Sequence, residues 1–288
     1  MTIIHPRETM PMFEAPCPPA RRASSALAGQ VDAPCPPARR AIITSLRDER
    51  HIRFAWLELT GRCTLACTHC YSESGPAVIA GDKLDHDAWR AVLRRLSEIG
   101  CRRIQFIGGE PTLYPGLADL LLCAGALGYE EIEIFTNGIR LKPEVFDAVR
   151  KTRARLAVSL HGGTRAAHDR ITGRPGSFDR TGETVRSAVA AGVPVRIAVI
   201  EHGDEAAVLS AIDAAHGWGV SDVDRYPLQP VGRAERSTAA EAAKFCGVCG
   251  QGMVCVRWDG YLYACVFRRS EPAGRVDDLW PAGQAPFA

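Results

Sequence analysis

The sequence predicts an α/β fold built around a parallel sheet. Two observations support this: six short apolar runs lie between residues 54 and 228, and stretches with apolar residues at helical spacing separate them. Strands joined through helices pair in parallel by right-handed crossovers. Six units are too few for a closed eight-stranded barrel, so the pattern permits a partial (β/α)6 TIM-like barrel or an open doubly wound sheet.

The first strand is expected at residues 54–60, and the first helix at residues 85–99, ending at Gly100. Further strands are expected at residues 103–107, 131–135, 156–160, 193–200 and 223–228. Pro227 makes the end of the last strand irregular. Further helices are expected at residues 117–127, 143–150, 181–191 and 205–216.

Length and composition place the chain among ordinary globular proteins. It has 288 residues, of which 46% are hydrophobic and 24% charged, and its formal net charge of +2 gives no reason to expect nucleic acid or an acidic membrane as partner. No apolar run is long enough for a membrane span, and residues 1–12 lack the apolar region of a signal peptide. We therefore expect a cytoplasmic protein, in which most of the eleven cysteines bind metal rather than form disulfides. Cys101 and Cys123 are expected to be packing residues.

The N-terminal region differs from the rest of the chain. It contains the nonapeptide Ala-Pro-Cys-Pro-Pro-Ala-Arg-Arg-Ala twice, with one cysteine in each copy, Cys17 and Cys35. The prolines predict a flexible, partly polyproline tail, in which two isolated cysteines lack a preformed metal site. Three regions are expected: a tail at 1–50, a barrel at 51–230 and a cysteine-rich module at 231–288.

Three cysteines follow the first strand in the pattern Cys-x3-Cys-x2-Cys: Cys63, Cys67 and Cys70. Cysteines at this spacing on one loop can turn their sulfurs toward one point, which indicates a metal site. A 4Fe–4S cluster held by only three cysteines leaves one iron free to bind another molecule. Two alternatives are a structural zinc site, which usually takes four ligands, and three buried cysteines that only fill space.

This motif resembles the signature of the radical S-adenosylmethionine (radical SAM) enzymes, with His69 before the last cysteine. The resemblance implies a partial barrel, a 4Fe–4S cluster on Cys63, Cys67 and Cys70, and SAM bound at the open iron. In this family one electron from the cluster cleaves SAM to methionine and a 5'-deoxyadenosyl radical, which takes a hydrogen atom from the substrate. A flavodoxin or ferredoxin-type protein would supply the electron.

The segment after the second strand, Gly108-Gly109-Glu110-Pro111, resembles the GGEP motif of the same family. Parallel barrels place their chemistry at the C-terminal ends of strands, where this segment lies. Glycines permit close approach of the backbone to a ligand, and a carboxylate can bind an ammonium group. The resemblance implies that this segment contacts the amino group of SAM.

Three further positions resemble SAM-binding sites of the family: Asn137, Ser159 and Arg170. For Arg170 a surface salt bridge is an equal alternative. His161 stands where many relatives carry an aspartate, so we expect a loop histidine bonded to the backbone rather than a catalytic proton donor.

Four more cysteines lie near the C-terminus: Cys246, Cys249, Cys255 and Cys265. The dipeptide Asp259-Gly260 between apolar residues predicts a hairpin that brings Cys255 and Cys265 together. The pattern resembles the SPASM and twitch extensions of radical SAM enzymes. This implies one auxiliary iron–sulfur cluster, of the 4Fe–4S type, in a twitch-like or shortened SPASM module, with a zinc knuckle as the alternative.

The resemblance implies a radical SAM enzyme that modifies a ribosomally synthesised peptide by a thioether or carbon–carbon crosslink. The alternative substrates are a sugar, an aminoglycoside or a nucleoside that is oxidised, decarboxylated or epimerised in natural-product biosynthesis. Residues 1–50 are too few and too proline-rich for the leader-binding domain of many peptide modifiers, so a separate leader-peptide-binding protein is expected. A non-catalytic iron–sulfur or zinc scaffold, from another class, would need neither SAM nor Glu110.

Overall fold

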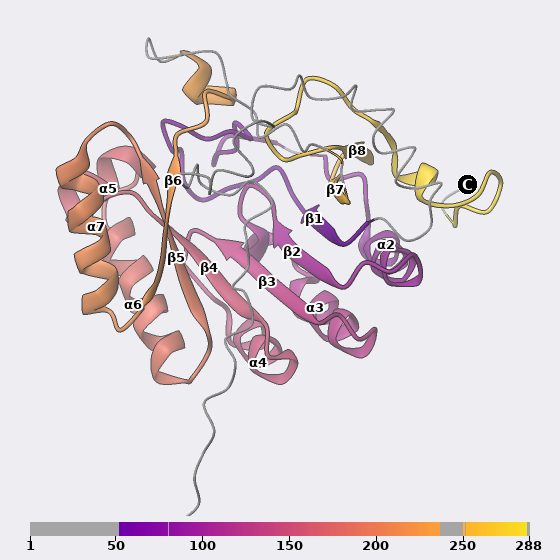
Figure 1. Cartoon of the computed structure of the whole chain (residues 1–288), viewed down its shortest axis with the longest axis horizontal. Coiled ribbons are helices and arrows are strands. Elements are labelled where there is room, and N and C mark those ends of the chain that lie inside the picture. Colours follow the sequence, from indigo (N-terminus) through magenta and orange to yellow (C-terminus); the bar gives the residue numbers. More distant parts are fainter. Residues whose placement is uncertain (1–51, 80, 237–249, 251, 287–288) are drawn as a thin grey trace, which may run out of the picture.

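A computed structural model of the chain describes residues 52–79, 81–236, 250 and 252–286. A single sheet runs through this part of the chain, in the strand order β6-β5-β4-β3-β2-β1-β7-β8-β9 (Figure 1). The tail predicted at residues 1–50 lies outside the described residues.

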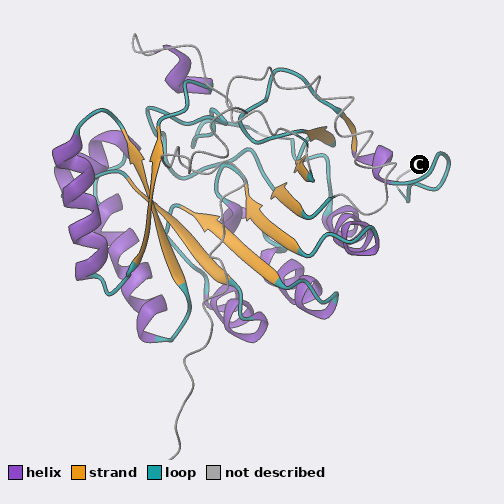
Figure 2. Ribbon diagram, viewed as in Figure 1, coloured by secondary structure: helices purple, strands orange, loops and turns teal. Residues whose placement is uncertain are grey.

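The first six strands form the predicted parallel sheet, because each pairs in parallel with the next strand along the chain. They are β1 (Phe54–Glu58), β2 (Arg103–Ile107), β3 (Glu131–Thr136), β4 (Arg155–Leu160), β5 (Val195–Glu201) and β6 (Asp222–Pro227). Helices lie along one side of the curved sheet (Figure 2). The α/β class with a partial barrel is therefore confirmed, and the open doubly wound sheet is not what forms.

Helices connect the strands and cover the core. They are α2 (His86–Glu98), α3 (Leu117–Ala126), α4 (Pro143–Thr152), α5 (Arg165–Thr172), α6 (Ser177–Ala190) and α7 (Glu205–Gly217). The first of them begins after Asp85, whose carboxylate accepts a hydrogen bond from the Ala88 amide at 2.8 Å. Its inward face buries Trp89, Leu93 and Leu96, and burying side chains of this size stabilises a fold by about 1.5–3 kcal/mol each.

Helix α5 was not predicted, because its sequence has few apolar residues to reveal a helical period. Its ends are set locally: Thr164 accepts a hydrogen bond from the Ala167 amide, and Gly173 ends the helix in the left-handed conformation. Helix α6 begins earlier than predicted because Asp169 of α5 accepts hydrogen bonds from the amides of Gly176 and Phe178. A tertiary contact therefore sets the start of α6.

The hairpin predicted around Asp259-Gly260 is present, and it continues the main sheet. Strand β7 (Met253–Arg257) pairs in parallel with β1, on the side opposite β2. Strands β8 (Tyr261–Tyr263) and β9 (Gly274–Arg275) then pair in antiparallel fashion. The C-terminal segment is thus attached by backbone hydrogen bonds to the strand that leads into the cysteine loop.

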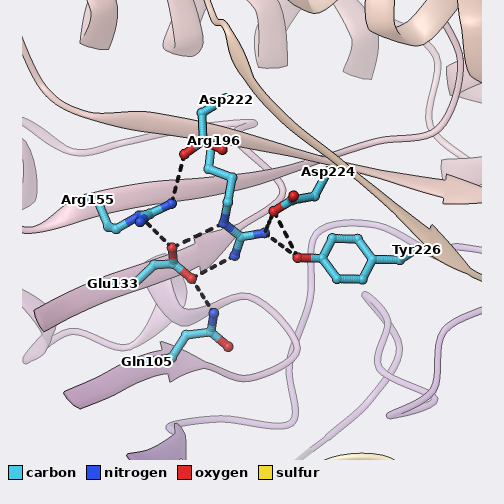
Figure 3. Close-up of polar contacts among 7 residues, drawn as sticks. All are labelled: Gln105, Glu133, Arg155, Arg196, Asp222, Asp224 and Tyr226. Atoms are coloured by element: carbon cyan, nitrogen blue, oxygen red, sulfur yellow. Dashed lines mark hydrogen bonds and ion pairs between the residues drawn. The ribbon is translucent and has the colours of Figure 1, made fainter. Parts of the chain in front are cut away.

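A charged network joins the neighbouring strands β2 to β6 (Figure 3). At its centre lies Glu133, which is fully buried, accepts a hydrogen bond from Gln105, and forms ion pairs at 2.8 Å with both Arg155 and Arg196. On β6, Asp222 pairs with Arg155 at 3.1 Å. Arg196 also contacts Asp224 at 3.4 Å and the Tyr226 hydroxyl at 2.9 Å. Because a buried charge without a partner is costly, these contacts favour one alignment of the strands.

Glu133→Gln should lower the free energy of unfolding by about 3–5 kcal/mol, because it leaves the buried guanidinium of Arg196 with too little negative charge. Urea denaturation followed by circular dichroism measures this. The matched control is Glu144→Gln on α4, where the exposed carboxylate is 4.0 Å from the Lys142 ammonium and the expected change is below about 0.5 kcal/mol. Equal effects of the two substitutions would contradict a central role for Glu133.

Candidate functional site

The cysteine loop follows β1 directly, and its three thiols interact electrostatically with one another. The sulfur of Cys63 accepts hydrogen bonds from the Leu65 amide at 3.4 Å and from Asn137 Nδ2 at 3.7 Å. Burial, together with the neighbouring Cys70 and Cys63, raises the pKa of Cys67 to about 12. Three sulfur donors on one loop, each within electrostatic reach of the others, fit a soft metal centre such as an iron–sulfur cluster.

The two glycines after β2 lie against the start of the cysteine loop. The Gly109 amide donates to the Thr60 carbonyl at 2.7 Å, and the Glu110 amide donates to the Arg62 carbonyl at 2.8 Å. A Cβ atom at Gly109 would lie 2.2 Å from the Arg62 oxygen, and one at Gly108 would lie 2.8 Å from the Thr60 oxygen. Only glycine allows the two segments to approach this closely.

Glu110 is fully buried, and its carboxylate accepts four hydrogen bonds. The donors are the amide and hydroxyl of Thr112, at 3.1 and 2.7 Å, the hydroxyl of Thr136 at 2.7 Å and the amide of Asn137 at 2.8 Å. Burial raises the pKa of Glu110, whereas these hydrogen bonds lower it. The carboxylate therefore connects the loop after β2 with the end of β3, and its contact with the SAM amino group stays a prediction.

Asn137 links three parts of the site. Its backbone amide donates to Glu110, its side-chain nitrogen donates to the Thr64 hydroxyl at 3.1 Å and to the Cys63 sulfur, and its backbone carbonyl accepts from Thr181 at 2.9 Å. The structure thus places this predicted residue directly at the cysteine loop. Because the side-chain amide of Asn137 is hydrogen-bonded to both Thr64 and Cys63, it fixes the position of the Cys63 sulfur.

Helix α5 supports the middle of the cysteine loop. The amides of Ala66 and Thr68 donate to the carbonyls of Thr172 and Ile171, both at 2.9 Å. Just after the helix, the Arg174 side chain donates to the Thr64 carbonyl at 3.1 Å. The carbonyls at the C-terminal end of α5 are therefore used to hold the loop rather than left to solvent.

The short 3-10 helix η2 (Gly232–Arg236) follows β6 and supports the other end of the loop. Arg233 donates from its side chain to the carbonyls of Cys67, at 2.7 Å, and Ser74, at 2.8 Å, and from its amide to Cys70 at 3.1 Å. This short segment after β6 therefore contacts the cysteine loop directly.

The other predicted SAM-binding residues differ in their exposure to solvent. Pro111 is buried at the start of the 3-10 helix η1 (Pro111–Leu113), and Ser159 is half-buried near the end of β4. Arg170 lies on α5 with an exposed side chain. Their contact with SAM stays a prediction.

The C-terminal cysteines are described in part. Cys255 is buried in β7 and Cys265 is buried just after β8, whereas Cys246 and Cys249 lie outside the described residues. Burial raises the pKa of Cys255 well above its usual value, and Glu58 raises it further. The nearby Arg269 forms a two-point ion pair with Glu58 at the end of β1, with both distances 2.9 Å. Cys101 and Cys123 pack in or against the core, as predicted.

Sequence reasoning missed a cluster of three histidines beside the cysteine loop: His69, His161 and His202. One ring nitrogen of each lies within 4.8 Å of the others. His69 belongs to the loop after β1, and the other two follow β4 and β5 directly. Their shared position after the C-terminal ends of strands was a signal that the sequence contained.

The surroundings of the histidine cluster keep its imidazoles neutral. Burial, together with neighbouring imidazoles, lowers the pKa of His69 to about 3 and the pKa of His161 well below its usual value. Nδ1 of His161 has no hydrogen-bond partner among the described residues. This nitrogen therefore does not make the hydrogen bond to the backbone that the sequence analysis expects. The backbone amide of His161 instead donates to Nδ1 of His168 at 3.2 Å.

The fold and the loop together define a class of protein: a partial β/α barrel that carries three thiols after its first strand. Residues 57–215, more than half of the chain, match the model of the Radical SAM superfamily. The chain belongs to this superfamily. Membership supports an enzyme and implies a 4Fe–4S cluster and SAM, and the three thiols fit that cluster. Within the described residues, no helix combines the length and apolar character that crossing a membrane requires.

The chain is similar to known proteins of several activities. It is 28% identical over 144 residues to the sporulation killing factor maturation protein SkfB of Bacillus subtilis (strain 168), covering 50% of this chain and 34% of SkfB. It is 30% identical over 180 residues to a probable GTP 3',8-cyclase of Saccharolobus islandicus (strain M.14.25 / Kamchatka #1), covering 61% and 57%. The chain thus spans between one third and somewhat over half of these curated relatives.

Among solved structures, SuiB of Streptococcus suis bound to its precursor peptide SuiA has a similar fold. The TM-score is 0.64 at 13% sequence identity, and the match covers 82% of this chain and 65% of SuiB. At this identity the likeness shows a shared fold.

Gly109→Ala should displace the cysteine loop, because the added Cβ would overlap the Arg62 carbonyl. We expect a loss of about 1–3 kcal/mol in the free energy of unfolding and a lower iron content after anaerobic reconstitution. The matched control is Gly217→Ala at the end of α7, where an added Cβ meets nothing within 4 Å. If Gly109→Ala binds iron as the parent does, the glycine is not needed for the close approach.

Arg233→Met should speed the loss of iron to a chelator by about 10-fold, because it removes the side-chain hydrogen bonds to the carbonyls of Cys67 and Ser74. Arg170→Met is the matched control, since this exposed arginine should leave iron retention unchanged. Equal retention by the parent and Arg233→Met would exclude the proposed support. The Arg170→Met variant also tests the predicted contact of Arg170 with SAM. If that contact exists, this variant should bind SAM more weakly than the parent.

Proposed function

We propose that this protein is a radical SAM enzyme that modifies a ribosomally synthesised peptide, forming a thioether or carbon–carbon crosslink. One observation carries the peptide assignment: the likeness to SuiB in complex with a precursor peptide covers 82% of this chain, more than the residues 57–215 that match the family model. The likeness to SkfB, which is named for the maturation of a killing factor, supports the same substrate class.

Cys63, Cys67 and Cys70 would hold the 4Fe–4S cluster, which with bound SAM supplies the 5'-deoxyadenosyl radical. The rest of the chain positions these ligands. Glu110 joins the loops after β2 and β3, because its carboxylate accepts a hydrogen bond from the Asn137 amide. The Asn137 side chain in turn donates a hydrogen bond to the Cys63 sulfur. A site fixed from several sides keeps the reacting groups in register, which is the main contribution of a protein scaffold to such chemistry.

The predicted SAM-binding set remains part of this proposal: Gly108, Gly109, Glu110, Pro111, Asn137, Ser159 and Arg170. Since the carboxylate of Glu110 already accepts four hydrogen bonds, we propose that it acts mainly as a positioning group for Thr136 and Asn137. A flavodoxin or ferredoxin-type protein would donate electrons, a separate protein would bind the leader peptide, and the reaction would take place in the cytoplasm.

Cys246, Cys249, Cys255 and Cys265 would hold an auxiliary 4Fe–4S cluster, whose chemistry is electron transfer or substrate binding. The parallel pairing of β7 with β1 supports this arrangement, because it places Cys255 on the strand next to the one that leads into the cysteine loop. The ion pair between Arg269 and Glu58 holds the following segment against β1. A zinc knuckle on the same four cysteines is the alternative.

A second candidate is a radical reaction on a nucleotide or another small molecule. The likeness to a probable GTP 3',8-cyclase favours it, since that match covers 61% of this chain. Oxidation, decarboxylation or epimerisation of a sugar or aminoglycoside belongs to the same candidate.

Reduction of the reconstituted protein with SAM should release 5'-deoxyadenosine, and the triple variant Cys63→Ala/Cys67→Ala/Cys70→Ala should release none. Chromatography with mass detection measures the product. The control is Cys123→Ala, which removes a half-buried thiol of α3 and should retain the activity. A parent protein that contains its cluster and releases no 5'-deoxyadenosine would contradict the radical reaction.

The substrate class is tested by adding candidate precursor peptides or GTP to the same assay. A peptide that loses two hydrogens, with a crosslink located by fragmentation, supports the first candidate. Turnover of GTP alone would replace it with the second.

A further inference from the structure

Two serine hydroxyls lie just after the last cysteine of the loop and form a hydrogen-bonded chain that ends on its sulfur. The hydroxyl oxygen of Ser72 is 3.2 Å from the sulfur of Cys70, and both contacts of the chain are hydrogen bonds. The hydroxyl oxygen of Ser74 is 3.0 Å from that of Ser72. A predicted metal ligand therefore has a hydroxyl partner, and that hydroxyl has a second one behind it.

Hydrogen bonds of the backbone fix the turn that carries these serines. The Glu73 amide donates to the Cys70 carbonyl at 3.2 Å. Arg233 donates from its amide to the Cys70 carbonyl at 3.1 Å and from its side chain to the Ser74 carbonyl at 2.8 Å. The chain from residue 70 to residue 74 is thus closed into a tight turn, which returns the Ser72 hydroxyl to the sulfur two residues before it.

The backbone of Glu73 shows that this turn is held under strain. Its φ angle is 52°, in the left-handed region that residues other than glycine rarely adopt. Such a conformation persists only where the surrounding contacts enforce it, and it is frequent at functional sites. The placement of the two serines on either side of Glu73 is therefore enforced by the fold.

Ser74 is buried under the glycine segment that follows β2. It is 2% exposed, and a Cβ atom at Gly109 would lie 2.9 Å from the Ser74 Cβ. The glycine therefore leaves the room that the Ser74 side chain occupies. A buried hydroxyl without a partner is costly, so Ser74 keeps its hydrogen bond to the half-buried Ser72.

Metal binding determines the direction of this chain. A free thiol of Cys70 could donate to Ser72, but a cysteine that ligates a metal is a thiolate without a proton. Its sulfur can then only accept, so Ser72 must donate its hydroxyl proton to the sulfur. The Ser72 oxygen is left to accept from Ser74, and each bond of such a chain strengthens the next.

Hydrogen bonds to the sulfur ligands are one of the factors that set the reduction potential of an iron–sulfur cluster. Reduction adds negative charge to the cluster, so a donor at a ligand sulfur stabilises the reduced form more than the oxidised form. We propose that Ser72, supported by Ser74, raises the reduction potential of the cluster that is bound through Cys70. The two serines are positioning residues that act through this sulfur, and because the role concerns the 4Fe–4S cluster it rests on the proposed function.

The test is a redox titration of the full-length, anaerobically reconstituted protein, followed by EPR in the absence of SAM. The signal of this cluster is the one that the triple cysteine-to-alanine variant lacks. The variants are Ser72→Ala, Ser72→Thr and Ser74→Ala. The matched control is Ser187→Ala, which removes an exposed hydroxyl of α6.

Ser72→Ala should make the cluster harder to reduce, by up to about tenfold in the equilibrium constant, which is about 59 mV for one electron. Ser74→Ala should shift the potential in the same direction by less, because Ser72 still donates to the sulfur. Ser72→Thr, which keeps a hydroxyl, and Ser187→Ala should titrate as the parent does.

A cluster of Ser72→Ala that titrates at the potential of the parent would overturn the proposal. A serine that only holds the loop would give this result, with a lower iron content and no change in potential. If Ser72→Ala binds no iron, Ser74→Ala decides the outcome, since its replacement leaves Ser72 in place, and an unchanged potential would then overturn the proposal.

The titration also separates this role from the radical reaction, because it involves no cleavage of SAM. A shifted potential in Ser72→Ala, together with a parent that releases no 5'-deoxyadenosine, would refute the radical function and leave the role of the serines standing. An unchanged potential with release of 5'-deoxyadenosine would refute the role of the serines alone. A parent without a cluster on the three cysteines would refute both.

Discussion

The backbone of the cysteine loop depends on hydrogen bonds from three neighbouring segments, and the arrangement of the whole site follows from them. The loop after β2 holds its start, the end of α5 holds its middle, and Arg233 of η2 holds its end. The loop contains no helix or strand to fix its own geometry. Three sulfurs can converge on one metal centre only if such outside contacts determine where each cysteine lies.

This dependence changes the interpretation of the Gly-Gly-Glu segment. By resemblance it was expected to contact SAM, and its position beside the cysteine loop agrees with that expectation. In the structure, however, the glycines are needed for close contact with the backbone of Thr60 and Arg62, and the Glu110 carboxylate is taken up by hydrogen bonds within the protein. The segment therefore serves the site first by holding the metal-binding loop, and any contact with SAM is made by a segment that is already fixed.

The sheet connects the two cysteine-rich regions. Because β7 adds to β1, the C-terminal segment shares backbone hydrogen bonds with the strand that leads into the cysteine loop. Glu58 and Arg269 strengthen this connection with a buried ion pair, which is costly to form and also costly to break. The backbone around Cys255 is therefore fixed directly to the strand that leads into the first cysteine loop.

The sequence by itself determined the strands, most of the helices and the three cysteines after β1, because these follow from local apolar patterns and from spacing within one loop. It did not reveal helix α5, since Arg165–Thr172 has too few apolar residues, nor the early start of α6, which depends on Asp169. The histidine cluster and the role of Arg233 were decided only by the tertiary structure. Their residues are far apart in the chain, and although the sequence places His161 and His202 after strands, side-chain contacts between distant segments form only when the sheet is assembled.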